Sequence, residues 1–191
     1  ALLPESVRAA LQRAQSAIGA RNFDAAELEL SLAERIKPGL NRIVVLRGLA
    51  ALERGQLAWA LHYLEAASRE RASVEANYYL ALVYERIGRH DEARHALLAA
   101  LHEEREHPLI DEIRVALARV NLVLGRPDRA ARQLRQALAA RPHDAALRHA
   151  LALALLRAGR SDDALAQLET VSADAEPESL LLLAKLRLLV G

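Results

Sequence analysis

The 191-residue chain carries 26 basic and 25 acidic side chains, and the two signs are mixed along its whole length, which gives no indication of a nucleic-acid-binding surface. It contains no cysteine, which excludes disulfides and thiol nucleophiles. Hydrophobic residues make up 52% of the chain but aromatic residues only 3%, so the apolar side chains are mostly Ala, Leu and Val. This composition suits closely packed helices better than sheets, and we expect an all-α protein.

Helices led by an alanine recur along the chain at a nearly constant spacing. Each has a large apolar residue four positions after the alanine and usually a small one seven positions after it, which places all three on one helical face. In chain order the copies are Ala26-Leu30-Ala33, Ala60-Leu64-Ala67, Ala93-Leu97-Ala100, Ala130-Leu134-Ala137 and Ala164-Leu168-Val171. The last four follow a glycine by five positions: Gly55, Gly88, Gly125 and Gly159. Arg21 stands at this place in the first copy.

Another set of helices is predicted before these glycines. Each has a large residue, a small one beside it and a third residue three positions later, as in Leu80-Ala81-Tyr84, Leu117-Ala118-Asn121 and Leu151-Ala152-Leu155. Each repeat is therefore expected to be a hairpin of a first and a second helix. Aspartates two positions before the leading alanines are expected to cap the second helices: Asp24, Asp91, Asp128 and Asp162.

A period near 34 residues, a large-small-Tyr first helix, a glycine turn and an alanine-led second helix resemble the tetratricopeptide repeat. The resemblance spans nearly the whole chain. It implies an α-solenoid, a right-handed superhelix of helical hairpins, as a single domain over residues 1–191. Repeats are expected to start near Val7, Asn41, Val74, Asp111 and Ala145, with a lone first helix from about Pro177.

The first two repeats depart from the family pattern in their first helices. Arg13 and Arg47 stand where a large apolar residue is expected, and Ala17 and Ala51 replace the aromatic residue. A three-residue excess before Pro108 falls in the polar run 102–107, which we expect to form extra helix or a longer loop.

The histidines are candidate metal ligands, and the best pairs are His90 with His95 and His102 with His107. A spacing of five separates two side chains by roughly 140° around a helix, whereas the zinc-protease motif has its histidines four apart on one face. We therefore expect no metal site and no cofactor. The chain also lacks a glycine-rich phosphate loop and a nucleophile-elbow serine, so we expect no catalytic residues and no enzyme activity.

The resemblance also implies a binding surface, because first helices line the concave wall in proteins of this family and hold partners there as peptides or helices. The residues that this places in the groove are Leu11, Gln15, Val45, Leu49, Leu52, Tyr78, Leu82, Arg86, Val115, Arg119, Leu122, His149, Leu153 and Leu156. Most are apolar, so we expect an apolar or amphipathic segment of a partner protein as ligand, with Arg86 and Arg119 orienting acidic groups on it. The family's clamp for a C-terminal carboxylate needs Lys and Asn on this wall. Neither residue type occurs at the matching positions of the first two repeats. We therefore do not expect this chain to act as a co-chaperone that binds partners through such a clamp.

Five of the six aromatic residues fall in the second and third repeats: Trp59, Tyr63, Tyr78, Tyr79 and Tyr84. Tyr and Trp are common anchors of protein interfaces. We expect Tyr78 to face the groove and the others to belong to the core, with Trp59 and Tyr63 packing between second helices.

The segment from Leu180 to Val190 is apolar nearly all round, although Lys185 and Arg187 interrupt it, and it is too short to cross a bilayer. We expect further chain, a second copy of the protein or a hydrophobic partner to cover it. The sequence begins with Ala1 and contains no methionine, so we also expect residues upstream, which could include a signal peptide or a membrane anchor.

These observations favour a non-catalytic scaffold or adaptor for protein–protein interaction, in a bacterial envelope assembly for secretion, pilus formation or polysaccharide export. A cytoplasmic chaperone-like or regulatory adaptor is the alternative, and the compartment, periplasm or cytoplasm, stays open. An RNA-binding helical repeat is more remote, because it needs a basic inner face and the expected wall is apolar with Glu75 and Glu112 nearby.

Overall fold

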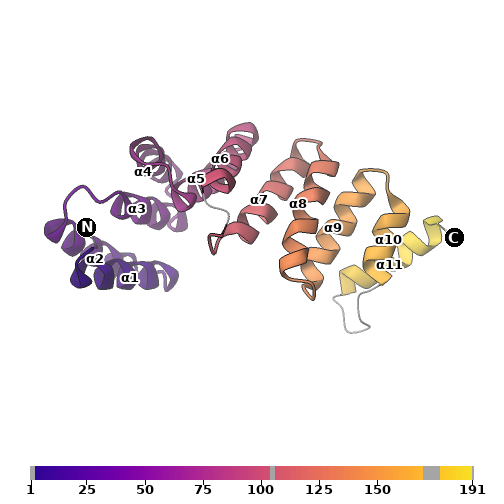
Figure 1. The fold of residues 1–191 in the computed structure, drawn as a ribbon, viewed down its shortest axis with the longest axis horizontal. Coiled ribbons are helices and arrows are strands. Elements are labelled where there is room, and N and C mark those ends of the chain that lie inside the picture. The colour runs from indigo at the N-terminus through magenta and orange to yellow at the C-terminus, as the bar shows by residue number, and fades with distance from the viewer. Residues whose placement is uncertain (1–2, 104–105, 170–176, 191) are drawn as a thin grey trace. The chain divides into compact units, whose positions relative to one another are not determined.

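The computed structural model describes residues 3–103, 106–169 and 177–190, and every regular element within them is an α-helix (Figure 1). The helices are α1 (Glu5–Gly19), α2 (Phe23–Ile36), α3 (Asn41–Glu53), α4 (Leu57–Glu70), α5 (Val74–Arg86), α6 (His90–Glu103), α7 (Ile110–Val123), α8 (Pro127–Ala140), α9 (Ala145–Arg157), α10 (Ser161–Glu169) and α11 (Pro177–Val190). Consecutive helices pack in pairs from α1 with α2 to α9 with α10, and α11 packs on α10. The described residues thus confirm five hairpins and a final helix.

The first helices begin within two residues of the expected repeat starts. Contacts along the chain divide it into two units, residues 1–105 with α1 to α6 and residues 106–191 with α7 to α11. A single continuous domain stays a prediction. The polar run 102–107 is helical at His102 and Glu103, and Glu106 and His107 lie outside regular structure.

Small side chains at the predicted positions let the two helices of each hairpin approach closely. The alanines that lead the second-helix pattern are all fully buried: Ala26, Ala60, Ala93, Ala130 and Ala164. The leucine four positions after each of them is at most 2% exposed. Val171, the last residue of the fifth copy, lies outside the described residues. The spacing read from the sequence therefore identifies the face on which each second helix packs.

The turn between the helices of a hairpin explains the recurring glycines. Gly55, Gly88, Gly125 and Gly159 have φ angles between 66° and 79°, which an L side chain rarely adopts. The residue after each glycine donates its N–H to a carbonyl five residues back, as Arg126 does to Asn121 at 2.8 Å. This is the hydrogen bond of a Schellman motif. Arg21 adopts the same conformation with φ 57°, and Asn22 donates to Ala17 at 2.8 Å, so the first hairpin makes the same turn without a glycine.

The predicted aspartate caps are wrong where the structure defines the cap. Asn22 is the N-cap of α2, and its side chain accepts a hydrogen bond from the N–H of Ala25 at 3.2 Å. Arg126 occupies the N-cap of α8 and makes no side-chain cap bond. Asp24 and Asp128 lie instead in the first turns of these helices, where their charge still interacts favourably with the helix dipole.

The hydrophobic clusters of the first unit each join one hairpin to the first helix of the next. Side chains of α1, α2 and α3 form one cluster, and those of α3, α4 and α5 form another. In the second unit, α7 to α10 contribute to one cluster, against which Leu182 and Leu183 of α11 pack. A hairpin therefore buries its apolar surface only when its neighbour is present, as is typical of repeat proteins.

We expect Ala93→Glu to destabilise the first unit by about 3–5 kcal/mol, because it would place an unpaired carboxylate at a fully buried helix crossing. The measurement is the free energy of unfolding from urea titration followed by circular dichroism. Ala99→Glu is the matched control, since Ala99 is exposed on the same helix. Equal stability of the two variants would contradict the packing described above.

We expect Gly48→Ala to cost about 1–3 kcal/mol of unfolding free energy. A Cβ atom at residue 48 would lie 2.5 Å from Cγ of Leu64, a side chain that is itself fully buried. Gly19→Ala is the control, because a Cβ atom there meets nothing within 4 Å. The same urea titration applies, and a Gly48→Ala midpoint equal to that of the Gly19→Ala protein would show that α3 and α4 are less closely packed.

Candidate functional site

Three of the predicted groove residues in the first unit lie in its core. Val45 and Leu52 of α3 are exposed by 2% and 1%, and they pack with side chains of α4 and α5. Leu11 of α1 is exposed by 8% in the cluster formed by α1, α2 and α3. These side chains hold neighbouring helices together and leave almost no accessible area for a ligand. We therefore exclude them from the candidate binding surface.

The other predicted groove residues of the first unit keep accessible surface: Gln15, Leu49, Tyr78, Leu82 and Arg86. We call this set the first-helix face. Its helices contact one another in order, α1 with α3 and α3 with α5. Arg86 is positioned by a hydrogen bond of 2.9 Å from its Nη1 to the carbonyl of Leu52, and Gln15 accepts one from Arg42 at 3.1 Å. The face therefore combines partly exposed apolar side chains with polar groups held at its edges.

The second unit presents its own predicted residues on α7 and α9: Val115, Arg119, Leu122, His149, Leu153 and Leu156. Arg119 is exposed, and the others are partly buried. Val115, Leu122 and Leu156 pack against the core of this unit. Nδ1 of His149 lies 2.9 Å from Oγ of Ser179, a buried residue of α11. His149 therefore positions the final helix as well as contributing to the predicted surface.

The aromatic residues divide between the core and the surface. Tyr84 is partly buried and donates a hydrogen bond of 2.9 Å to Glu65, and burial, followed by this bond, raises the pKa of Tyr84. Burial also raises the pKa of Tyr79. Trp59 is 58% exposed, so the prediction of a core tryptophan is wrong. Its position immediately before the buried Ala60 could have revealed this, since adjacent helical residues point about 100° apart.

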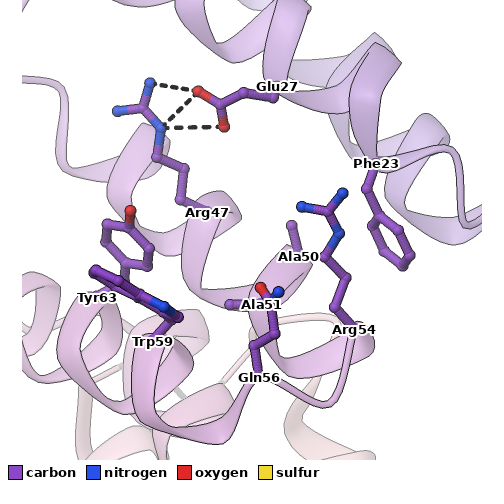
Figure 2. Close-up of a pocket in the computed structure, with 9 residues that line it drawn as sticks. All are labelled: Phe23, Glu27, Arg47, Ala50, Ala51, Arg54, Gln56, Trp59 and Tyr63. Carbon is purple, nitrogen blue, oxygen red and sulfur yellow. Dashed lines mark hydrogen bonds and ion pairs between the residues drawn. The ribbon is translucent and has the colours of Figure 1, made fainter.

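A cavity of about 220 Å³ lies over α3, between α2 and α4 (Figure 2). Its lining residues are Phe23, Glu27, Arg47, Ala50, Ala51, Arg54, Gln56, Trp59 and Tyr63. Figure 2 shows Trp59 and Tyr63 on one side and Phe23 with Arg54 on the other. The rings of Trp59 and Tyr63 are stacked, with centroids 6.1 Å apart. The cavity opens where Ala51 stands in place of the family's aromatic residue, the position that Tyr84 occupies in the third repeat.

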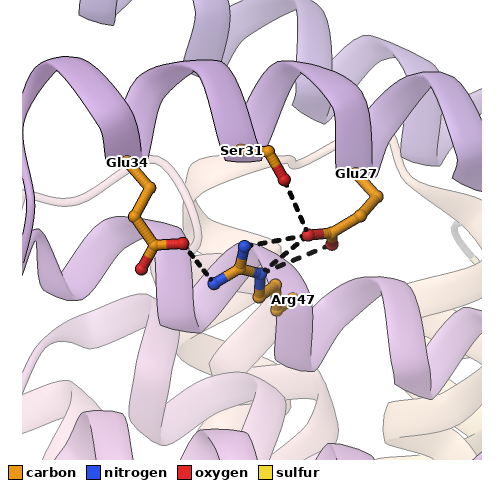
Figure 3. Close-up of polar contacts among 4 residues, drawn as sticks. All are labelled: Glu27, Ser31, Glu34 and Arg47. Carbon is orange, nitrogen blue, oxygen red and sulfur yellow. Dashed lines mark hydrogen bonds and ion pairs between the residues drawn. The ribbon is translucent and has the colours of Figure 1, made fainter.

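Arg47 closes one end of this cavity and is held by two glutamates of α2 (Figure 3). Its Nη2 lies 2.8 Å from Oε1 of Glu27, and its Nη1 lies 2.9 Å from Oε2 of Glu34. Ser31 donates a hydrogen bond to Glu27 at 3.2 Å. The hydrogen bond to Glu27 is the largest influence that raises the pKa of Arg47, which stays charged. The guanidinium is thus occupied in joining α3 to α2.

Arg13, the other arginine that departs from the family pattern, is used in a similar way. Its guanidinium binds Glu29 of α2 through two hydrogen bonds of 2.8 Å, a bidentate geometry that suits this pair. The same contact raises the pKa of Arg13 and lowers that of Glu29. Both substitutions of an apolar residue by arginine are therefore matched by acidic residues on α2, a relation that the first-helix pattern alone did not reveal.

The opposite side of the cavity carries a cation that is weakly neutralised. The guanidinium of Arg54 lies 5.0 Å from the ring centroid of Phe23, within the range of a cation–π interaction. Its ion pair with Asp24 is 3.4 Å long, and the Asp24 side chain is 98% exposed. Arg21 lies 5.8 Å from the same ring and donates to the carbonyl of Glu53 at 3.3 Å. Two guanidinium groups thus flank Phe23 beside the cavity.

A second cavity of about 510 Å³ lies near the start of α3, between the α2–α3 loop and the ends of α4 and α5 that meet there. Arg42 and Glu75 form an ion pair of 2.5 Å within it. Asn41 donates to the carbonyls of Ala67 and Arg71, at 3.1 Å and 2.9 Å. The ion pair connects α3 with the next hairpin, whereas the two Asn41 bonds join α3 to α4 within one hairpin, and we assign this cavity no ligand.

Two of the four candidate histidines make local contacts. Nδ1 of His107 accepts a hydrogen bond from the backbone of Leu109 at 3.2 Å, and Nε2 of His95 lies 3.0 Å from Arg94. In the described ranges no three His, Cys, Asp or Glu residues gather closely enough to hold a metal ion. Within the same ranges, each helix is too short or too polar to cross a membrane.

The apolar C-terminal segment forms α11, of which Leu180 and Leu181 are exposed. The side chains of Leu186 and of residues 188–190 lie outside the described residues. Self-association through this segment stays a prediction, and light scattering at several protein concentrations would test it.

Solved structures that share this arrangement of helices include PilF of Pseudomonas aeruginosa, with a TM-score of 0.83 and 17% identity over 97% of this chain and 84% of that one. MamA AMB-1 has a TM-score of 0.67 and 20% identity over 87% and 96% of the two chains. A thermophilic TPR protein of Thermus thermophilus has a TM-score of 0.64 and 22% identity over 95% and 99%. At these identities the likeness shows the fold alone.

No curated protein matches the chain by sequence. Two family models, both described as tetratricopeptide repeat, match residues 45–108 and 122–186. Together they cover most of α3, all of α4 to α6 and all of α8 to α10, and so include the glycine turns and four of the buried alanines described above. The chain therefore belongs to the tetratricopeptide repeat family, whose members are scaffolds for protein–protein interaction and are typically non-catalytic.

Proposed function

We propose that this scaffold binds an apolar or amphipathic peptide or helix of a partner protein on the exposed faces of its first helices. The observation that carries the proposal is the partial exposure of Leu49, Tyr78 and Leu82. These residues lie on the successive first helices α3 and α5, whose other apolar side chains already fill the hydrophobic core. Such side chains present apolar area at little cost to the packing of the hairpins. A partner segment that lies across α3 and α5 would bury them together.

Tyr78 is the best candidate for an anchor on this face. Its ring centroid lies 5.4 Å from that of Tyr79, and Tyr79 in turn packs against the core of the second and third hairpins. A tyrosine supported in this way is ordered before a ligand arrives, so little conformational entropy is lost on binding. Arg86, fixed by the carbonyl of Leu52, has further N–H groups with which to orient an acidic residue of the ligand.

Peptide binding is favoured over RNA binding by the chemistry of the same face. Of its five residues only Arg86 is charged, and an RNA-reading surface needs several basic groups for the phosphates. The Arg42 guanidinium near Gln15 is neutralised by Glu75. These observations support a protein ligand.

For the cellular setting we propose an assembly in the bacterial envelope, with a cytoplasmic chaperone-like or regulatory adaptor as the alternative. The two settings differ in the upstream sequence that they require, since export needs a signal peptide or an anchor. Fractionation of source cells that express the full-length protein with a C-terminal tag tests this. Recovery in the envelope or periplasm would support an envelope assembly. Recovery in the cytoplasm would contradict it and support a cytoplasmic adaptor.

A photo-crosslinking amino acid placed at Leu82 in the source cell tests the proposed surface. We expect it to capture a partner protein that the same group at Ala99, an exposed position on the second helix α6, does not capture. Mass spectrometry of the crosslink then identifies the partner segment, which we expect to be apolar or amphipathic. Equal capture from both positions would contradict binding at the first-helix face.

We expect Tyr78→Ala to weaken binding of that segment by about tenfold, the effect of removing one buried aromatic anchor. Titration calorimetry with a synthetic peptide of the crosslinked segment gives the affinity, and circular dichroism is expected to show unchanged helicity. Leu98→Ala is the control, because it removes an exposed apolar side chain of α6 that lies outside this face. Unchanged affinity in the Tyr78→Ala protein would remove Tyr78 from the site.

A further inference from the structure

The cavity over α3 lies on the side of this helix that faces away from the first-helix face. Its α3 residues are Arg47, Ala50, Ala51 and Arg54, whereas Leu49 belongs to the first-helix face. Arg47 and Leu49 are two residues apart and therefore point roughly 200° apart around the helix. A ligand in the cavity would leave the first-helix face open, so the two surfaces can act independently.

The cavity is large enough for one aromatic side chain. Its volume of about 220 Å³ exceeds the roughly 150 Å³ that is known to admit benzene. The methyl groups of Ala50 and Ala51 line it at α3, and aromatic rings stand on two of its sides. A ring that enters between them would contact apolar atoms of all three helices.

Trp59 is exposed beyond what the packing of its helix needs. The buried side of α4 is formed by Ala60, Leu64 and Ala67, and the indole lies outside this set with 58% of its surface accessible. Stacking on Tyr63 nevertheless orders the ring. An ordered, exposed tryptophan beside a cavity is typical of residues that dominate binding energy at interfaces.

The charges around the cavity favour an acidic ligand. Glu27 and Glu34 already occupy Arg47, whereas Arg54 is paired through a 3.4 Å contact with the fully solvated Asp24. Phe23 holds the Arg54 guanidinium in place through their cation–π contact, so a carboxylate would meet a positioned donor. A basic ligand would be repelled by this arginine.

From these observations we infer that the cavity over α3 is a second binding site, which takes an acidic peptide segment of a partner protein. An aromatic side chain of the segment enters between Trp59 and Phe23, and a neighbouring carboxylate pairs with Arg54. The site goes beyond the proposed function, because it adds a surface of different chemistry to the same scaffold. With both faces occupied, the first unit would hold two partner segments at once.

Trp59 is the only tryptophan of the chain, so its fluorescence reports on this site alone. The probe is the acetylated and amidated peptide Ser-Asp-Phe-Glu-Ser, and we expect its titration to change the Trp59 emission saturably. Ser-Lys-Phe-Lys-Ser, Ser-Asp-Ala-Glu-Ser and oligouridine are the comparison ligands, and we expect each to bind at least about tenfold more weakly. Equal binding of the basic peptide, or preferential binding of oligouridine, would overturn the assignment.

Two variants separate the parts of the site and keep the Trp59 signal. Ala51→Tyr restores the family's aromatic residue and fills the cavity, so we expect binding of the acidic probe to be lost. Arg54→Gln removes the cation from a side chain that is 42% exposed, so we expect normal folding and a loss of about tenfold in affinity. Tyr78→Ala, on the other face, is expected to leave this titration unchanged. If both Ala51→Tyr and Arg54→Gln bind the acidic probe as tightly as the parent protein does, the proposal is overturned. This outcome does not depend on whether the first-helix face binds its own partner.

Discussion

The structure depends on the close approach of paired helices, which fully buried alanines at the crossings allow. A larger side chain at Ala60 or Ala130 would separate the two helices of its hairpin, and the leucines beside them would no longer fill the space between hairpins. Because each cluster of the first unit also includes the first helix that follows, the contact within one hairpin orders the next. The same stacking determines which side chains are left over for binding.

The fold was largely predictable from the sequence because its determinants are local and repeated. A spacing of four and seven identifies the buried side of each second helix. A glycine identifies the turn, because glycine adopts a positive φ more readily than any other residue. Arg21 shows the limit of this reasoning. It takes the glycine conformation in the first hairpin, since the hydrogen bond from Asn22 and the packing of α1 on α2 require that turn whatever residue occupies it.

The binding surface was less predictable because it depends on contacts between repeats. Val45 and Leu52 share the apolar character of Leu49, and only the positions of α4 and α5 decide that the first two are buried. The departures at Arg47 and Ala51 were visible in the sequence, but their consequences were not. Glu27 and Glu34 hold the arginine from another hairpin, and the missing ring at residue 51 leaves a cavity whose walls come from three helices. Trp59 belongs to the same surface, and its expected burial was inferred from residue type alone.

The sharing of each cluster between adjacent hairpins bears on how such a chain changes over evolutionary time. Each cluster of the first unit spans one junction, so duplicating or deleting a hairpin rebuilds a single junction and leaves the remaining junctions intact. The number of repeats can therefore vary by whole units of sequence. The junction between α2 and α3 is less tolerant, because a hairpin inserted there would separate Arg47 from both Glu27 and Glu34 and leave all three charges to find new partners.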